Sequence, residues 1–215
     1  MSKIRDKLIN YIKVNRVSTT ELSDALSKSG SVLGVRPIDY QSARHKVGKI
    51  KCVFAYNNSN FLVHEDLKKV NANDTVIIFT KKFNNKSIIG DLIAKFTLLY
   101  KQASSIVVLG NVRDLPKLIK ERYPIWCKGF NPVGSENIFK GNFPKNEKTK
   151  ILKKFDGGIA VCDATGVVLV EKNKISQKLF DKIKFIEKQE DTWYHCLDVK
   201  KWDTKKIIVD KSYKK

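Results

Sequence analysis

The stretch that decides the fold is residues 90–114, which read GDLIAKFTLLYKQASSIVVLGNVRD. A glycine and an aspartate open an apolar segment, so we expect a helix from about Asp91 to Gln102. The run that follows, Ile106–Leu109, has no polar residue, which is typical of a strand buried on both faces of a sheet. A buried strand that follows such a helix indicates an α/β fold.

Polar residues stand at both ends of this helix–strand unit. Gly90 and Asp91 begin the helix, and the first turn of a helix exposes N–H groups that suit a carboxylate ligand. Arg113 and Asp114 follow the carboxyl end of the strand, where α/β sheets bind their ligands. An arginine there can hold an anionic substrate, and an aspartate can hold a hard cation. Each residue also has a structural explanation as a helix cap, ion pair or turn glycine, so their combination carries the hypothesis.

The remaining sequence alternates between helical and extended patterns. Ser18 and Glu21 form a capping-box pattern at the start of a helix, and Gly30 is a plausible stop. The segment 129–154, rich in Pro, Gly, Asn and Lys, is interpreted as a long irregular loop, and 81–89 as a shorter loop. Helices are expected at 3–14, 18–30, 62–70, 113–122 and 176–190, and strands at 47–56, 75–80, 106–109, 125–127, 158–162 and 167–170.

Length and composition limit the class of protein. The 215 residues suit one large domain or a domain with an appendage, and we divide them into a domain at 1–190 and an extension at 191–215. The extension holds Trp193 and Trp202, so we expect it to pack on the domain or on a neighbouring subunit. The longest apolar runs are far below the ~20 residues that a membrane span needs. The charged amino terminus lacks the apolar core of a signal peptide, which predicts a cytoplasmic protein.

Cysteines and histidines make no metal-binding pattern. The four cysteines are widely scattered, with no C-x-x-C spacing, and the three histidines form no pair with them. We expect free thiols in or near a core, without structural zinc. The four cysteines are Cys52, Cys127, Cys162 and Cys196.

The charge is strongly positive, because 42 Lys and Arg residues face 22 Asp and Glu residues, a net charge of +20. Only six of these cations are Arg, and the lysines are spread along the whole chain. Nucleic-acid surfaces usually concentrate their cations and add Arg or stacking aromatics. Nucleic-acid binding is therefore allowed but not favoured, although a field of this sign attracts anions from small carboxylates to RNA.

The chain resembles the RraA-like family, which includes the regulators of ribonuclease E activity and the class II 4-hydroxy-4-methyl-2-oxoglutarate aldolases, which also decarboxylate oxaloacetate. The family's hallmark is a glycine followed, about twenty residues later, by Arg-Asp, and here 22 residues separate Gly90 from Arg113. The resemblance covers roughly residues 17–190. It extends to the helix at 18–26, the strand at 47–50, the segment 123–126 and the hairpin at 156–170.

The resemblance implies a mixed-layer β/β/α sandwich akin to the swivelling phosphohistidine domain, assembled as a homotrimer or hexamer. In the family's aldolases the site lies between subunits, and a neighbour's carboxy-terminal region supplies an acidic residue. Glu187, Glu190 and Asp191 are the candidates here, and no motif selects among them.

The resemblance also implies the roles of the site residues. Asp114 ligates Mg²⁺ or Mn²⁺, Arg113 holds the keto-acid end of the substrate, and Asp91 orients metal-bound water. The substrate-binding position is formed by Gly90, Leu92 and Ile93, with the N–H groups of the last two on the substrate carboxylate.

These roles predict a divalent-metal-dependent lyase, of the aldolase or decarboxylase type, that acts on a 2-keto acid through a metal-stabilised enolate. One alternative is a non-catalytic RraA-like regulator that binds a ribonuclease, RNA or another acidic partner. That branch of the family commonly lacks the aspartate after the arginine, which is Asp114 here. A further alternative is a related enzyme on a larger acidic sugar. The chain departs from the aldolase pattern at Leu109-Gly110, where Asp-Gly is usual, in the segment 129–154 and in the long tail.

Overall fold

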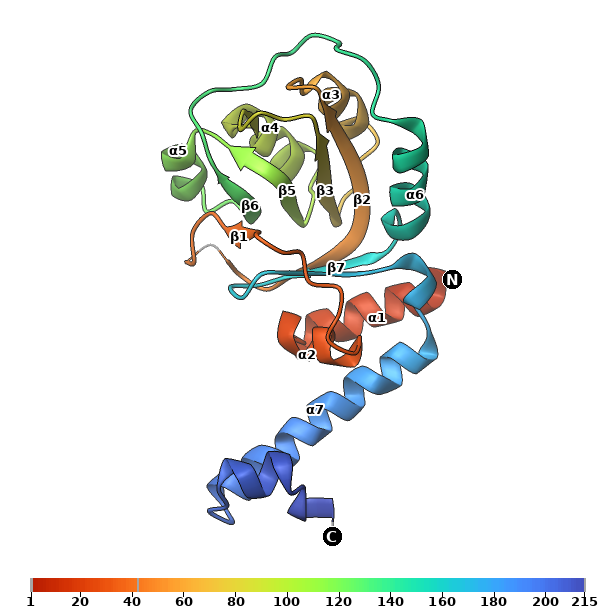
Figure 1. The fold of residues 1–215 in the computed structure, drawn as a ribbon, viewed down its shortest axis with the longest axis vertical. Helices are drawn as coiled ribbons and strands as arrows, with labels where there is room; N and C mark the ends of the chain where they lie inside the picture. The colour runs from red at the N-terminus through yellow and green to blue at the C-terminus, as the bar shows by residue number, and fades with distance from the viewer. Residues whose placement is uncertain (1, 42, 215) are drawn as a thin grey trace.

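A computed structural model describes residues 2–41 and 43–214. Within these residues the strands form one mixed sheet in the order β1-β6-β5-β3-β2-β7-β8, with β4 paired to β5 (Figure 1). The strands are β1 (Arg36–Pro37), β2 (Lys46–Tyr56), β3 (Asp74–Lys81), β4 (Ser87–Ile89), β5 (Ser105–Val112), β6 (Ile125–Phe130), β7 (Ile159–Cys162) and β8 (Val167–Val170).

The middle of the sheet is parallel and its two ends are antiparallel. β2, β3, β5 and β6 run parallel, with a shift of register between β5 and β6 after Val108, whereas β1, β7 and β8 pair antiparallel to their neighbours. The helical elements are α1 (Ser2–Asn15), α2 (Thr19–Ala25), α3 (Phe61–Leu67), α4 (Asp91–Lys95), η1 (Phe96–Tyr100), α5 (Leu115–Lys120), α6 (Lys145–Phe155), η2 (Lys172–Lys174), α7 (Gln177–Asp198), η3 (Lys205–Val209) and η4 (Ser212–Lys214).

The strand β2 is the longest, with eleven residues, and the sheet curls along it. It therefore belongs to both halves of the fold, the parallel half with β3, β5 and β6 and the antiparallel half with β7 and β8. Ile50 and Phe54 of β2 share one core cluster with Trp126 of β6 and with Ala160 and Leu169 of β7 and β8. Residues of the two halves therefore face each other across an inner core. Alternate β2 residues, such as Val53, point instead to an outer core, as the period of two in a strand requires.

Helices cover the outer faces of both halves. α3, α4 and α5 pack on the parallel half through Val63, Ile93 and Leu118. α1 and α7 pack on β7 and β8 through side chains such as Leu8 and Ile183. The α/β class is thus confirmed. The expected β/β layering takes the form of two halves of one sheet, and the likeness to the phosphohistidine domain and the oligomer stay predictions.

The segment 129–154 is less irregular than its composition suggests. It contains α6, whose Ile151, Leu152 and Phe155 pack against the inner core. The many Lys and Asn residues around this short apolar face hid it in the sequence. The loop expected at 81–89 also ends in a strand, β4, which at three residues is too short to show any alternation.

Two helix boundaries near the expected site are corrected. The helix expected over 91–102 is α4 followed by a π-helical turn, Phe96–Tyr100. The helix expected from residue 113 begins at Leu115, because Arg113 and Asp114 link β5 to α5. The capping box of Ser18 and Glu21 is confirmed, with hydrogen bonds in both directions.

The carboxy-terminal helix is longer than predicted. α7 continues past residue 190 to Asp198 and projects from the body of the molecule (Figure 1). The tail then turns back onto this projecting part, where the Trp202 N–H donates to the Cys196 carbonyl at 3.1 Å and Ile207 is buried. Division of the chain at residue 190 stays a prediction. Among the described residues, none of the helices is long and apolar enough to cross a membrane.

Asp163 joins α2 to the β7–β8 hairpin and allows a direct test of this packing. Its carboxylate accepts hydrogen bonds at 2.8 Å from the Thr19 N–H, the Thr19 hydroxyl and the Thr165 N–H. We expect Asp163→Ala to lower the free energy of unfolding by about 2–4 kcal/mol in urea denaturation, because it leaves several donors without a partner. Asp181→Ala, at an exposed helical acid, serves as the control and should change it by less than about 0.5 kcal/mol. Equal effects of the two changes would contradict this account.

Candidate functional site

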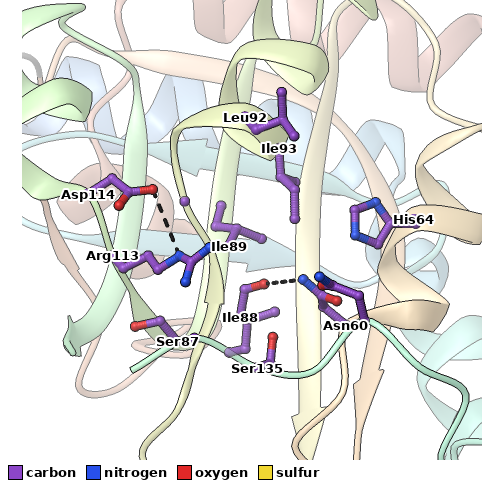
Figure 2. Close-up of a pocket in the computed structure, with 13 residues that line it drawn as sticks. Asn60, His64, Ser87, Ile88, Ile89, Leu92, Ile93, Arg113, Asp114 and Ser135 are labelled. Atoms are coloured by element: carbon purple, nitrogen blue, oxygen red, sulfur yellow. Dashed lines mark hydrogen bonds and ion pairs between the residues drawn. The ribbon is translucent and has the colours of Figure 1, made fainter. Parts of the chain in front are cut away.

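A pocket of about 120 Å³ lies beyond the carboxyl ends of the parallel strands (Figure 2). β4 and the start of α4 form its floor, the link between β5 and α5 forms one side, and α3 forms the other. The loop that follows β6 closes it through Gly134, Ser135 and Asn137. The pocket therefore collects side chains from segments that are far apart in the sequence.

The link between β5 and α5 presents two opposite charges to this pocket. The Arg113 N–H donates to the Ile89 carbonyl at 3.0 Å, which holds the link against β4. Asp114 adopts a left-handed conformation with φ of 60°, which ends the strand abruptly before α5 begins. The Arg113 Nε lies 3.8 Å from Asp114 Oδ2, and both side chains stay partly exposed, at 49% and 40%.

One hydrogen bond connects this link to the start of α4. The Asp91 N–H donates to Asp114 Oδ2 at 3.1 Å, so the carboxylate caps the first turn of the helix. The contact requires glycine at position 90, because a β-carbon there would collide with Asp114 Oδ2 and crowd the Arg113 side chain. A β-carbon on Gly134 would likewise collide with the Arg113 guanidinium. Two glycines thus make room for the two charged side chains.

The opposite side of the pocket is polar and incompletely paired. The Asn60 side-chain amide donates to the Ile88 carbonyl at 3.2 Å (Figure 2). Asn60 Oδ1 and Ser135 Oγ are buried, and neither finds a hydrogen-bond partner among the described residues. Buried oxygens without partners are uncommon and point to a ligand or an ordered water. His64 on α3 completes this side.

Most residues predicted from the sequence meet at this pocket. Gly90, Leu92, Ile93, Arg113 and Asp114 all line it. Figure 2 shows Arg113 and Asp114 on one side, with Leu92 and Ile93 at the start of α4. Sequence reasoning missed Asn60, His64 and Ser135, because they follow β2 and β6 without any motif of their own. The polar pair Ser59-Asn60 after a long apolar strand was the one available signal.

The backbone N–H of Asp91 contacts the site through its hydrogen bond to Asp114. The Asp91 side chain is not among those that line the pocket. Burial raises the pKa of Tyr123, and the carboxylates of Glu121 and Asp91 raise it further. The Asp91 carboxylate thus lies within electrostatic reach of Tyr123, close to α5. Its role in orienting water stays a prediction.

The three acidic candidates of the carboxy-terminal region lie on α7, away from the pocket of their own chain. Glu187 accepts a hydrogen bond from the Tyr11 hydroxyl at 2.6 Å, which raises the pKa of Tyr11 to about 12. Burial raises the pKa of Glu190, and nearby acids, first among them Glu21, raise it further. None of Glu187, Glu190 and Asp191 lines the pocket. Only a second subunit can bring such a residue to it.

The donor set restricts the metal that this pocket can hold. No group of three His, Cys, Asp or Glu side chains within the described parts of the chain is placed to hold an ion. Asp114 supplies one carboxylate, whereas Asn60 Oδ1 and Ser135 Oγ are buried in the opposite side of the pocket. Mg²⁺ and related cations are typically held by one or two carboxylates, with water and substrate oxygens at the other positions. Asp114 is therefore the pocket residue that could hold such a cation.

The cysteines take no part in the site. All four are buried free thiols, as predicted. Burial raises the pKa of the Cys127 thiol to about 11, so it is protonated at neutral pH.

Comparison with known proteins agrees with this architecture. The model of the RraA-like family, described as Aldolase/RraA, matches residues 19–169. The chain therefore belongs to the RraA-like family, whose members include both lyases and non-catalytic regulators of ribonucleases. No curated protein matches the sequence.

Several solved structures share the fold at low sequence identity. An uncharacterised protein from Pseudomonas syringae is 17% identical, with 92% of this chain and 93% of that chain covered and a TM-score of 0.69. An unusual member of the RNase ES inhibitor RraA family from Streptomyces coelicolor is 18% identical, with 86% and 95% covered and a TM-score of 0.65. The RNA-processing inhibitor RraA from Thermus thermophilis is 20% identical, with 71% and 91% covered and a TM-score of 0.57.

The contact between Gly90 and Asp114 can be measured with a double-mutant cycle. We expect Gly90→Ala to lower the free energy of unfolding by about 1–3 kcal/mol, because the new β-carbon displaces the Asp114 carboxylate. In an Asp114→Ala background the same change should cost at least about 1 kcal/mol less, since the colliding oxygen is gone. Urea denaturation of the four proteins measures both values, and a cost independent of residue 114 would refute the contact.

Proposed function

We propose that this protein is a divalent-metal-dependent lyase, of the aldolase or decarboxylase type, acting on a small 2-keto acid. The observation that supports this most is the convergence of Asp114, Arg113 and the first turn of α4 on one pocket. This arrangement offers a ligand for a cation, a fixed positive charge and free N–H groups within one small volume. A 2-keto acid carries the complementary groups, a carboxylate and an adjacent keto oxygen.

The substrate carboxylate is bound at the start of α4. The N–H groups of Leu92 and Ile93 fall in the first turn, where a helix leaves its donors without backbone partners. Arg113 lies beside this turn and can donate from a planar fork to the carboxylate or to the keto oxygen. Together these groups orient the keto acid with its reactive carbon toward Asp114.

Asp114 is the residue that would hold the cation, with water and substrate oxygens at the other coordination positions. A bound Mg²⁺ or Mn²⁺ would polarise the keto oxygen and stabilise the negative charge that develops when the carbon–carbon bond breaks. The Arg113 guanidinium adds a second positive charge that is already in place before the reaction begins. Decarboxylation of oxaloacetate needs no base, so this chain's own pocket supplies all the groups it requires.

Aldol cleavage additionally needs a group that removes a hydroxyl proton. We assign this task to water oriented by the Asp91 carboxylate, with an acid from a neighbouring subunit's α7 as the completing residue. Such a site forms only in an oligomer, which we propose to be a trimer or hexamer.

The pocket volume favours a small substrate. The loop after β6 brings Gly134, Ser135 and Asn137 onto the pocket and leaves about 120 Å³. A larger acidic sugar therefore fits this arrangement less well than oxaloacetate does.

A second candidate function is that of a non-catalytic regulator. The observation that favours it is that Asp114 is the only carboxylate among the described residues that line the pocket. The net charge of +20 also suits a partner with an acidic segment. Retention of a purified ribonuclease on the immobilised protein at physiological salt, with no lyase activity, would support this function over the first.

Replacement of Asp114 tests the lyase proposal. We expect Asp114→Asn to lower the affinity for Mn²⁺ at least about tenfold, because the only charged ligand is lost. Oxaloacetate decarboxylation, measured above the rate with metal alone, should fall about 100-fold or more. Electron paramagnetic resonance of free Mn²⁺ and a coupled pyruvate assay provide the two measurements.

Glu121→Gln is the matched control, because Glu121 is an exposed acid at the end of α5 and the charge change is the same. This variant should keep both properties of the parent protein. Full Mn²⁺ affinity and full turnover in Asp114→Asn would show that the metal ligand is assigned wrongly. A wild-type protein without activity on a panel of 2-keto acids, beside an active family aldolase, would contradict the proposed function itself.

A further inference from the structure

A second, larger cleft lies at the opposite edge of the sheet from the candidate site. It has a volume of about 620 Å³ and is lined by the segments that lead into β2, β3 and β5. Its other wall is α1, which precedes the segment that matches the family, residues 19–169. This cleft is therefore built partly by a helix that the family match does not include.

α1 presents two different faces. Leu8 and Ile12 are fully buried against β7 and β8. Arg5, Ile9 and Lys13, spaced four residues apart, fall on another face of the helix and line the cleft. The helix is thus held by its apolar stripe while it directs two cations toward the strand ends.

The cations of the cleft exceed its anions. Lys49 pairs with the buried Asp74 at 3.1 Å, and Arg5 contacts Asp6 at 3.3 Å. These pairs account for both carboxylates among the residues that line the cleft. The remaining cations, Lys13 and Lys46 on the cleft wall and Arg44 beside it, have no acidic partner within 4.0 Å among the described residues.

Lys46 is one of the unpaired cations that line the cleft. Its side chain is half-buried at the start of β2. Burial lowers the pKa of its ammonium group, and the positive charges of Arg44 and Lys13 lower it further. Lys46 therefore feels the positive charges of two neighbouring cations, and a bound anion would offset that repulsion.

We propose that this cleft binds a small multivalent phosphate anion. Cations that converge without acidic partners suit a ligand with several negative charges better than one carboxylate. Asn10, Asn73 and Gln102 add amide groups that can bond phosphate oxygens. The volume falls in the range of small-molecule sites, roughly 300–1,000 Å³.

A small anion is favoured over the backbone of RNA, which carries the same phosphate chemistry. Among the described residues that line the cleft there is no Phe, Tyr or Trp on which a base could stack. Single-stranded nucleic acids are usually bound through such stacking together with charge.

The test uses inorganic tripolyphosphate as the probe and isothermal titration calorimetry of the full chain at physiological ionic strength. Wild type should bind one equivalent, and the double variant Lys13→Gln/Lys46→Gln should lose at least about tenfold in affinity. Lys150→Gln/Lys153→Gln, at exposed positions of α6, removes the same charge away from the cleft and should stay within about twofold. Thermal denaturation checks folding, and the exposed Lys13→Gln alone serves if the double variant does not fold.

Equal losses in the two double variants, or no saturable binding to wild type, would overturn the proposal. A short uridylate oligomer provides the second arm of the experiment. The proposal expects it to compete weakly and to lose affinity equally in both double variants. An oligomer that displaced tripolyphosphate at lower concentration, and only when Lys13 and Lys46 were present, would assign the cleft to RNA instead.

Discussion

The hydrogen bond from the Asp91 N–H to Asp114 Oδ2 fixes the geometry on which the proposed chemistry depends. It joins the start of α4 to the end of β5, two places that the chain separates by a helix and a strand. The carboxylate is thereby held at the pocket, with Oδ2 engaged by the helix. Gly90 is part of the same constraint, because a β-carbon at this position would collide with the carboxylate in its present place.

The residues that meet at this contact could be singled out from the sequence because they belong to one helix–strand unit, although the hydrogen bond between them was not predicted. The buried run Ile106–Leu109, the glycine before the helix and the Arg-Asp pair after the strand all lie within residues 90–114, and the structure brings them together. The strands at 47–56, 75–80, 158–162 and 167–170 were also predictable, since their apolar runs are long or bounded by turns.

The rest of the site was not predictable for two physical reasons. Asn60 and Ser135 reach the pocket through long-range pairing, in which Ser59 pairs with Glu136 and Ser87 with Gly134, and no local pattern encodes such contacts. α6 has a narrow apolar face among lysines, so its helical period is weak. The start of α5 was misplaced because the left-handed Asp114 ends the preceding segment, although Pro116 in the first turn marks a helix that begins at Leu115.

The two ends of the parallel strands therefore have different electrostatic characters. The carboxyl ends hold a small pocket in which the Asp114 carboxylate and the Arg113 guanidinium lie side by side. The amino ends, together with α1, hold a broad cleft with unpaired cations. The chain, with a net charge of +20, thus presents a carboxylate at one edge of its sheet and unpaired cations at the other.

The most direct test of the central claim is a crystal structure of the protein grown with Mn²⁺ and oxalate, with anomalous diffraction data to locate the metal. The account predicts an anomalous peak within coordination distance of the Asp114 carboxylate, with oxalate between Arg113 and the first turn of α4. A metal bound elsewhere, or an oxalate-free pocket closed by side chains, would contradict it.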